Sequence, residues 1–160
     1  TVAISGDGNT IAVGSVGDDD AGYDDGIYNV GAVYVYVKSG GTWSQTHKLY
    51  PVGTSRMALS KFGAAISISD DGNILLIGAN AQGVVYTATR SGGNWTLSTS
   101  TTSITGDDMA ASDQFSISVT GALGLQISGN GTTAIVGADS VDAANGFVDA
   151  GAAYIFKPDI

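Results

Sequence analysis

Several residue types are missing from this 160-residue sequence or are scarce in it. Cysteine is absent, which excludes disulfide frameworks, thiol chemistry and cysteine-ligated zinc. Glutamate is also absent, and charged residues make up only 13%, which argues against helical bundles and coiled coils. A single histidine excludes metal sites built from histidine clusters. No apolar run approaches the roughly 20 residues of a membrane-spanning helix, so no membrane span is expected.

Aspartate and glycine are abundant instead. All fifteen acidic residues are aspartate, glycine accounts for 24 residues, and the net charge is −9. A surface this acidic repels phosphate backbones, so nucleic acid is not an expected partner. A hydrophobic content of 43% is too high for a disordered chain. The composition predicts an all-β domain with many turns rich in aspartate and glycine, and its acidity suits a soluble extracellular protein.

Three segments of the chain repeat one pattern. Each has an apolar alternation that ends in Ile-Ser, a short turn, and an apolar run that ends in glycine. These segments are residues 2–15, 65–80 and 125–139. A strand of the type Gly-Ala-Val-Tyr follows each segment and begins at Gly31, Gly83 and Gly151. Two units continue with a Gly-Gly-x-Trp step, which contains Trp43 and Trp95. Because the landmarks recur in the same order, we predict about three units.

Each unit is predicted to form antiparallel strands. Glycine and asparagine in the first turn accept the positive φ that a tight hairpin requires. The second strand is apolar throughout, as in residues 74–77, which is typical of a strand buried on both faces. The third strand alternates, with Val33 and Val35 on one face and Tyr34 and Tyr36 on the other. The fourth strand begins at the tryptophan and becomes polar, as expected of an outer strand.

The predicted fold class is all-β, with about three four-stranded antiparallel blades like those of a β-propeller. A single domain, 1–160, divides into blades at approximately 1–61, 62–114 and 115–160. The last blade is incomplete, because no tryptophan-bearing strand follows Phe156. A neighbouring chain or a longer propeller would complete it: copies can close a ring or join head to tail through terminal or edge strands as a filament. We therefore expect a homo-oligomer or polymer.

Phe-Gly and Gly-Ala pairs mark the units, at Phe62-Gly63, Gly78-Ala79 and Gly137-Ala138. Together with the Ile-Ser-x-Asp-Gly turn, they resemble FG-GAP repeats, the blades of integrin α-subunit-type β-propellers in bacterial secreted and surface proteins. The resemblance implies an extracellular or cell-surface location. The pattern departs from the family at Gly14-Ser15 and Phe115-Ser116. The family's calcium loop is shortened in every unit, which favours plain hairpin turns there.

The densest group of acidic residues lies in the loop 17–26. Its five carboxylates belong to Asp18, Asp19, Asp20, Asp24 and Asp25. Carboxylates this close repel one another, so calcium would stabilise an ordered form of the loop. The candidate metal ligands are Asp18, Asp20, Asp24 and Asp25. The alternative, a solvated acidic loop, is favoured because the spacing fits no standard calcium loop.

Aromatic residues and the histidine have separate interpretations. Tyr23 and Tyr28, in and just after the acidic loop, are candidate residues for binding a protein or glycan partner. The remaining aromatic residues at matching repeat positions are expected to pack within and between blades, namely Tyr34, Tyr36, Tyr86, Tyr154, Trp43 and Trp95. His47 lies in a predicted outer strand with no nucleophile motif, so a surface position is expected rather than a catalytic one.

The sequence favours a non-enzymatic extracellular structural or adhesive protein that self-associates, in its sharpest form as the subunit of a surface fibre. No cofactor is required, and calcium is the one candidate. The alternative is a ligand- or calcium-binding propeller segment of a larger cell-surface receptor or adhesin. A hydrolase that uses aspartates at a blade rim is the least supported function, because nothing selects a pair of carboxylates.

Overall fold

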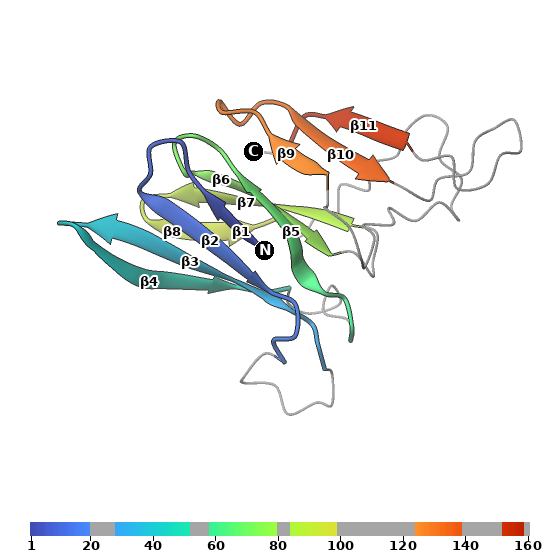
Figure 1. The fold of residues 1–160 in the computed structure, drawn as a ribbon, viewed down its shortest axis with the longest axis horizontal. Helices are drawn as coiled ribbons and strands as arrows, with labels where there is room; N and C mark the ends of the chain where they lie inside the picture. The colour runs from blue at the N-terminus through green and yellow to red at the C-terminus, as the bar shows by residue number, and fades with distance from the viewer. Residues whose placement is uncertain (20–27, 52–57, 80–83, 99–123, 139–151, 159–160) are drawn as a thin grey trace, which may run out of the picture.

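The computed structural model describes residues 1–19, 28–51, 58–79, 84–98, 124–138 and 152–158 (Figure 1). Within these ranges the chain forms eleven strands in three antiparallel sheets, and no helix. The described residues therefore include no helix long and apolar enough to cross a membrane. The predicted all-β, blade-like fold is confirmed, although the three sheets form an open stack rather than a closed ring.

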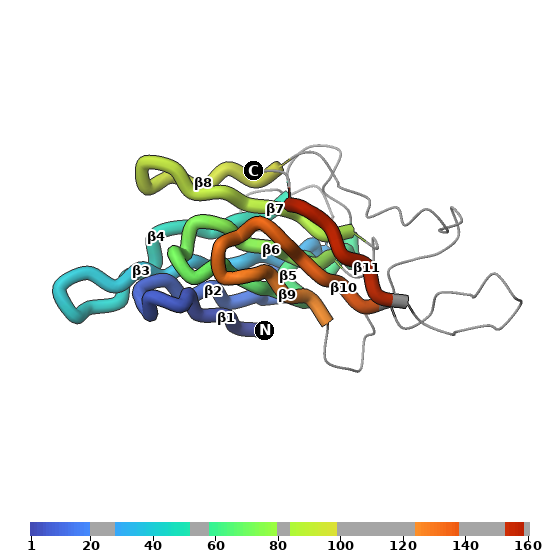
Figure 2. Tube along the Cα trace, turned by 90° about the horizontal axis from the view of Figure 1, so that it is seen from above, coloured from blue at the N-terminus to red at the C-terminus, as the bar shows by residue number. Residues whose placement is uncertain are grey.

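Each sheet follows the order of the chain. The first sheet contains β1 (Val2–Ile4), β2 (Thr10–Ser15), β3 (Ala32–Ser39) and β4 (Thr42–Leu49). The second contains β5 (Phe62–Ile68), β6 (Ile74–Ala79), β7 (Val84–Ser91) and β8 (Asn94–Leu97). The third contains β9 (Leu125–Ile127), β10 (Ala134–Ala138) and β11 (Ala152–Phe156). The second sheet lies between the other two (Figures 1 and 2).

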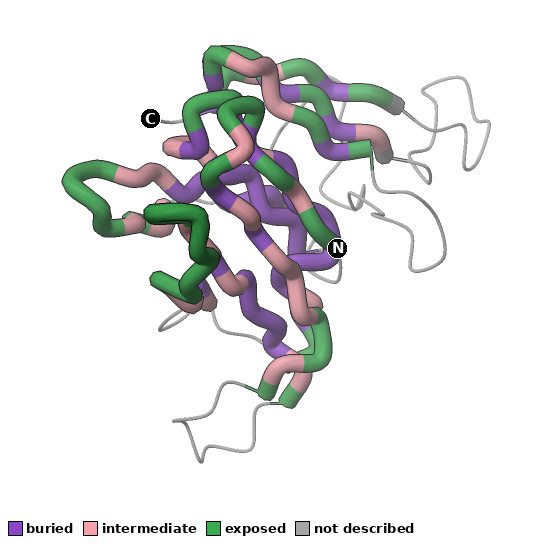
Figure 3. Tube along the Cα trace, turned by 60° about the vertical axis from the view of Figure 1, so that its left-hand side comes forward, coloured by how far each residue is buried: buried purple, intermediate pink, exposed green. Residues whose placement is uncertain are grey.

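Side-chain alternation gives the second sheet a core on both faces. On β6, Leu75 and Ile77 face the first sheet, whereas Leu76 faces the third. The core towards the first sheet contains Ala12, Val33, Val35, Leu49, Phe62, Ile66, Leu75, Ile77, Ala79, Tyr86 and Ala88. The core towards the third contains Ala65, Leu76, Val85, Leu125, Ala134, Val136 and Tyr154. Burial is therefore concentrated in the middle of the stack (Figure 3).

The predicted hairpin turns lie side by side and are bonded to one another. Gly8, Gly72 and Gly131 have positive φ in the β1–β2, β5–β6 and β9–β10 turns, as predicted. The backbone N–H of Asp7 donates to the carbonyl of Asp70 at 2.9 Å, and the N–H of Asp70 donates to the carbonyl of Gly129 at 2.9 Å. These two hydrogen bonds link the three sheets backbone to backbone along one edge of the stack.

The Phe-Gly pair lies at the tightest contact between the first two sheets. Phe62 is fully buried, and its ring packs edge-on against Tyr86 at 5.2 Å between centroids. Gly63 has a φ of 87°, and a β-carbon on Gly14 would lie 2.0 Å from the Gly63 carbonyl oxygen. Gly14, near the end of β2, therefore leaves no room for a side chain, because the backbone of Gly63 in the second sheet passes directly over it.

Candidate functional site

The acidic loop is described only at its edges. Asp20, Tyr23, Asp24 and Asp25 lie outside the described residues, so their assignment to a metal or a partner stays a prediction. Asp18 lies where the loop leaves β2, and Lys48 of β4 donates to its Oδ1 at 2.8 Å. The hydroxyl of Tyr34 donates to its Oδ2. Both carboxylate oxygens of Asp18 thus already accept protein donors.

The Asp18 cluster shifts the titration of both its partners. The hydrogen bond to Asp18, with burial, raises the pKa of Tyr34, because the hydroxyl proton is held by a carboxylate. Burial acts to lower the pKa of Lys48, but the hydrogen bond and charge of Asp18 outweigh it and the pKa is raised. The ammonium therefore stays charged, 5.5 Å from the Tyr34 ring centre. This cluster anchors the start of the acidic loop to β3 and β4.

Just after the acidic loop, Tyr28 and Asn29 lie beside Leu59, and both Asn29 and Leu59 have a left-handed backbone conformation. The backbone N–H of Asn29 donates to Oδ1 of Asp19 at 2.7 Å, and Asn29 has a φ of 55°. Tyr28 is exposed, and its carbonyl accepts from the N–H of Leu59 at 2.9 Å. Its assignment to partner binding stays a prediction. Leu59 is also exposed and has a φ of 61°, a conformation that a leucine rarely adopts.

Two carboxylates of the hairpin turns, those of Asp7 and Asp71, accept hydrogen bonds from their own turns. Asp71 accepts from the Ser69 hydroxyl at 2.6 Å and from the Asn73 backbone and side-chain nitrogens at 3.0 and 2.9 Å. These donors, the Ser69 hydroxyl foremost, lower its pKa. Asp7 makes the same contacts in the first turn, with Ser5 foremost in lowering its pKa. Across the described part of the chain, no three acidic or histidine side chains gather as a metal site.

The outer face of the first sheet carries apolar side chains that no other described sheet covers. We call it the front face: Val2, Ile4, Ile11, Val13, Tyr34, Tyr36 and Trp43. Val2 is 74% exposed and Ile4 is 59% exposed. Tyr34 and Tyr36 are only half-buried. Tyr86 and Tyr154 occupy the position of Tyr34 in the other two units, and both are buried as predicted. The difference arises because none of the described sheets covers the front face.

The outer face of the third sheet is the second such surface. We call it the rear face: Gln126, Ile135, Ala153 and Ile155. Ile135 and Ile155 pair directly across β10 and β11, and they are 42% and 73% exposed. Isolated exposed apolar residues are ordinary in proteins, but paired isoleucines on a sheet face indicate a contact surface.

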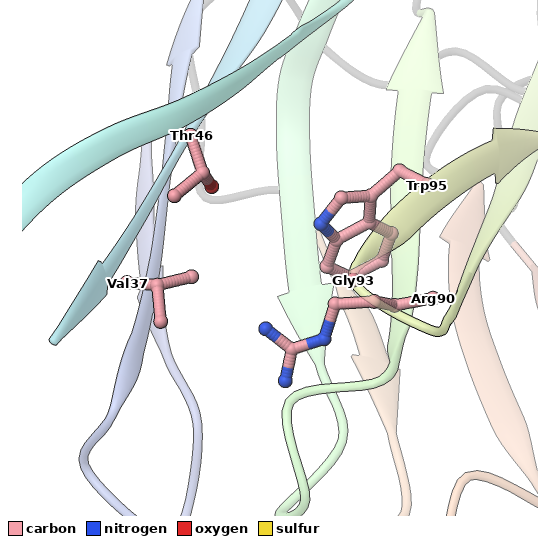
Figure 4. Close-up of a pocket in the computed structure, with 5 residues that line it drawn as sticks. All are labelled: Val37, Thr46, Arg90, Gly93 and Trp95. Atoms are coloured by element: carbon pink, nitrogen blue, oxygen red, sulfur yellow. The ribbon is translucent and has the colours of Figure 1, made fainter. Parts of the chain in front are cut away.

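A cleft opens between β3–β4 of the first sheet and β7–β8 of the second (Figure 4). It has a volume of about 400 Å³ and is lined by Val37, Thr46, Arg90, Gly93 and Trp95. The Arg90 guanidinium lies 5.6 Å from the Trp95 ring centre and donates to Asn73 Oδ1 at 2.9 Å and to Thr10 Oγ1 at 3.3 Å. The buried Nε1 of Trp95 has no hydrogen-bond partner within the described structure. The cleft therefore offers donors to a group that accepts hydrogen bonds.

His47 lies in β4, as the sequence predicted, but its side chain is half-buried rather than fully at the surface. Its buried Nδ1 makes no hydrogen bond to any described residue, so no described aspartate orients the ring through that nitrogen. The sequence did not indicate the cleft or the two outer faces as binding surfaces, and it assigned Trp95, Tyr34, Tyr36 and Trp43 to packing within and between blades. A signal for the faces is present in the repeat alignment, since Ile11, Val13 and Ile135 are apolar at positions where the second unit has the buried Leu75, Ile77 and Leu76.

Comparison with models of known protein families and with curated protein sequences finds no match for this chain. The resemblance to FG-GAP repeats consequently depends on the Phe-Gly, Gly-Ala and turn residues of the sequence itself. The structure gives two of these a physical role, since Phe62 fills the core and Gly63 meets Gly14 at the sheet contact.

Proposed function

We propose that this chain is a non-enzymatic structural or adhesive module that self-associates through its β-blades. The supporting observation is that both outer faces of the stack expose apolar side chains where the equivalent residues of the second sheet are buried. Covering such faces removes apolar surface from water, which is the main driving force for protein association. A fibre or other repeating assembly at the cell surface is the form in which such a module acts.

Membership of the FG-GAP repeat family and an extracellular location belong to the same proposal. They are supported by the repeated turns, the Phe62-Gly63 pair and the acidic, cysteine-free composition. Apolar faces on a protein of net charge −9 also fit a module that stays soluble until it meets its partner.

Sedimentation velocity and negative-stain imaging of the 160-residue chain over a wide concentration range test the self-association. We expect the mean mass to rise with concentration, and to rise further with salt, because screening weakens the repulsion between acidic copies. A monomer of constant mass at every concentration and salt would contradict the proposal.

The cleft favours a second candidate function, binding of a ligand that carries a carboxylate or another hydrogen-bond acceptor. Its support is the unpartnered Nε1–H of Trp95 beside the Arg90 guanidinium. Titration of a Trp43→Phe variant with uronic acids and neutral sugars would test it, since Trp95 is then the only tryptophan. We expect saturable fluorescence changes with acidic sugars that Arg90→Met removes. An unchanged spectrum throughout would exclude the site.

A further inference from the structure

We infer that self-association is head to tail, with the front face of one copy stacked on the rear face of the next. This inference depends on the proposed function. It adds which surfaces meet and in which direction. Its support comes from the two contacts between sheets within the chain, because both use the same pair of surfaces.

Three front-face residues, Ile11, Val13 and Tyr34, occupy positions that are buried in the other two sheets. Ile11 and Val13 of β2 align with Leu75 and Ile77 of β6, which are fully buried against the first sheet. In the third sheet the same positions are Ala134 and Val136, which are buried against the second sheet. Tyr34 likewise aligns with the buried Tyr86. The front face of every sheet is thus built to be covered by the sheet before it.

The rear-face residues show the same relation in the opposite direction. Ile135 aligns with Leu76, which is fully buried against the third sheet. Ile155 aligns with Val35 of β3 and Thr87 of β7, and both of those are buried. A rear face is therefore built to be covered by the front face of the sheet that follows.

Rear against front is the only pairing of faces among the described sheets. The first sheet contributes Val33 and Val35 to a contact in which the second contributes Leu75 and Ile77. The second sheet in turn presents its rear face to the front of the third. A second copy can repeat this contact with the same kinds of residue.

Hydrogen bonds between the turns give the stack a direction. In both links the earlier sheet donates an N–H and the later sheet accepts with a carbonyl, from Asp7 to Asp70 and from Asp70 to Gly129. The carbonyl of Gly6, equivalent to those of Asp70 and Gly129, accepts no hydrogen bond from the described residues. The N–H of Gly129, equivalent to that of Asp70, likewise donates to none of them. The rear end thus supplies a donor and the front end an acceptor.

Such a contact joins two different surfaces, so each copy keeps one free face after pairing. Assembly therefore continues until a ring closes, or without limit as a filament. A symmetric dimer, which uses the same face of both copies, would stop at two. The distinction can be measured with variants that block one face at a time.

The front-blocked variant carries Val2→Asp and Ile4→Asp, and the rear-blocked variant carries Ile135→Asp and Ile155→Asp. All four side chains are exposed, so both variants are expected to keep the wild-type circular dichroism spectrum. Thr42→Asp with Thr96→Asp is the control, because it adds the same charge at exposed positions of the outer strands β4 and β8.

Sedimentation velocity should find each blocked variant monomeric, with self-association weakened by about a hundredfold or more because a carboxylate would be buried unpaired. An equimolar mixture should form a one-to-one complex and nothing larger, since only one compatible pair of faces remains. The control should assemble like the wild type. If the wild type assembles and the rear-blocked variant still forms a dimer alone, or the mixture stays monomeric, head-to-tail stacking is wrong while self-association stands. If the wild type is monomeric, both fail.

Discussion

The second sheet and its two neighbours have the same repeat pattern but different surroundings. Leu76 of the second sheet is fully buried, while its equivalent Ile135 in the third is 42% exposed. Tyr86 is buried and Tyr34 is only half-buried. The residues are similar, so the difference lies in whether another sheet covers them. Burial in this fold is therefore a property of position in the stack.

The largest expected difference between the sheets is in their cores. Leu76→Ala should lower the free energy of unfolding by about 2–5 kcal/mol, because it leaves a cavity between the second and third sheets. Ile135→Ala should lower it by less than about 1 kcal/mol in the monomer, because that side chain is partly in water already. Urea denaturation at low protein concentration measures both. Equal losses for the two variants would show that Ile135 is covered in the monomer.

The next largest effect is the difference in stability between substitutions at two glycines, one at the contact between sheets and one in an outer hairpin. Gly63 and Gly93 both have a φ near 90°, but a β-carbon on Gly63 would lie 2.8 Å from the Ala32 carbonyl oxygen, whereas Gly93 has open space around it. Gly63→Ala should therefore destabilise the protein by about 1–3 kcal/mol more than Gly93→Ala. Thermal unfolding of the two variants measures the difference, and equal melting temperatures would rule out a tight contact there.

Low pH should weaken the first two hairpin turns, which contain Asp7 and Asp71. It should not weaken the third, where Asn130 takes the place of the aspartate. The folded-state pKa values of Asp7 and Asp71 are lowered, so their contribution to stability is present above about pH 4 and is lost as the pH falls through the folded-state values. Asp71→Asn should flatten this pH dependence, because the side-chain oxygen of Asn130 accepts the same bonds in the third turn. Urea denaturation from pH 5 to pH 3 measures it. An unchanged slope would contradict the role of Asp71.

Calcium should have the smallest effect. The carboxylates of Asp7 and Asp71 and both oxygens of Asp18 already accept protein donors, and no three acidic or histidine side chains gather among the described residues. The spacing of the carboxylates in the loop 17–26 fits no standard calcium loop, so calorimetric titration with calcium should release little heat, and a chelator should leave the melting temperature unchanged. Saturable binding that Asp20→Ala weakens would instead support the predicted site in the acidic loop.

Local features of this fold could be predicted from the sequence. Gly8, Gly72 and Gly131 mark the turns because their left-handed φ is a property of the residue itself. The alternation at Val33 and Tyr34 correctly predicts which side chains share a face. Such features depend on neighbours within the same strand or hairpin.

Features that depend on a second sheet could not be predicted in the same way. The sequence treats Tyr34 and Tyr86 as equivalent, and only the sheet in front of Tyr86 makes it buried. The cleft needs Val37 of one sheet and Arg90 of another, which are far apart in the chain. The ion pair of Asp18 with Lys48 joins a loop to a strand 30 residues away, and no spacing rule indicates it.

The turn-to-turn hydrogen bonds have a consequence for how the sequence can change over evolution. They join backbone atoms, so the separation of neighbouring sheets at that edge does not depend on side-chain volume. Equivalent buried positions accordingly hold residues as different in size as Ala12 and Leu76. A duplicated unit inherits the backbone groups that align it with its neighbour before its side chains have adapted. Proteins of this kind can therefore lengthen by duplication and refine each new core afterwards.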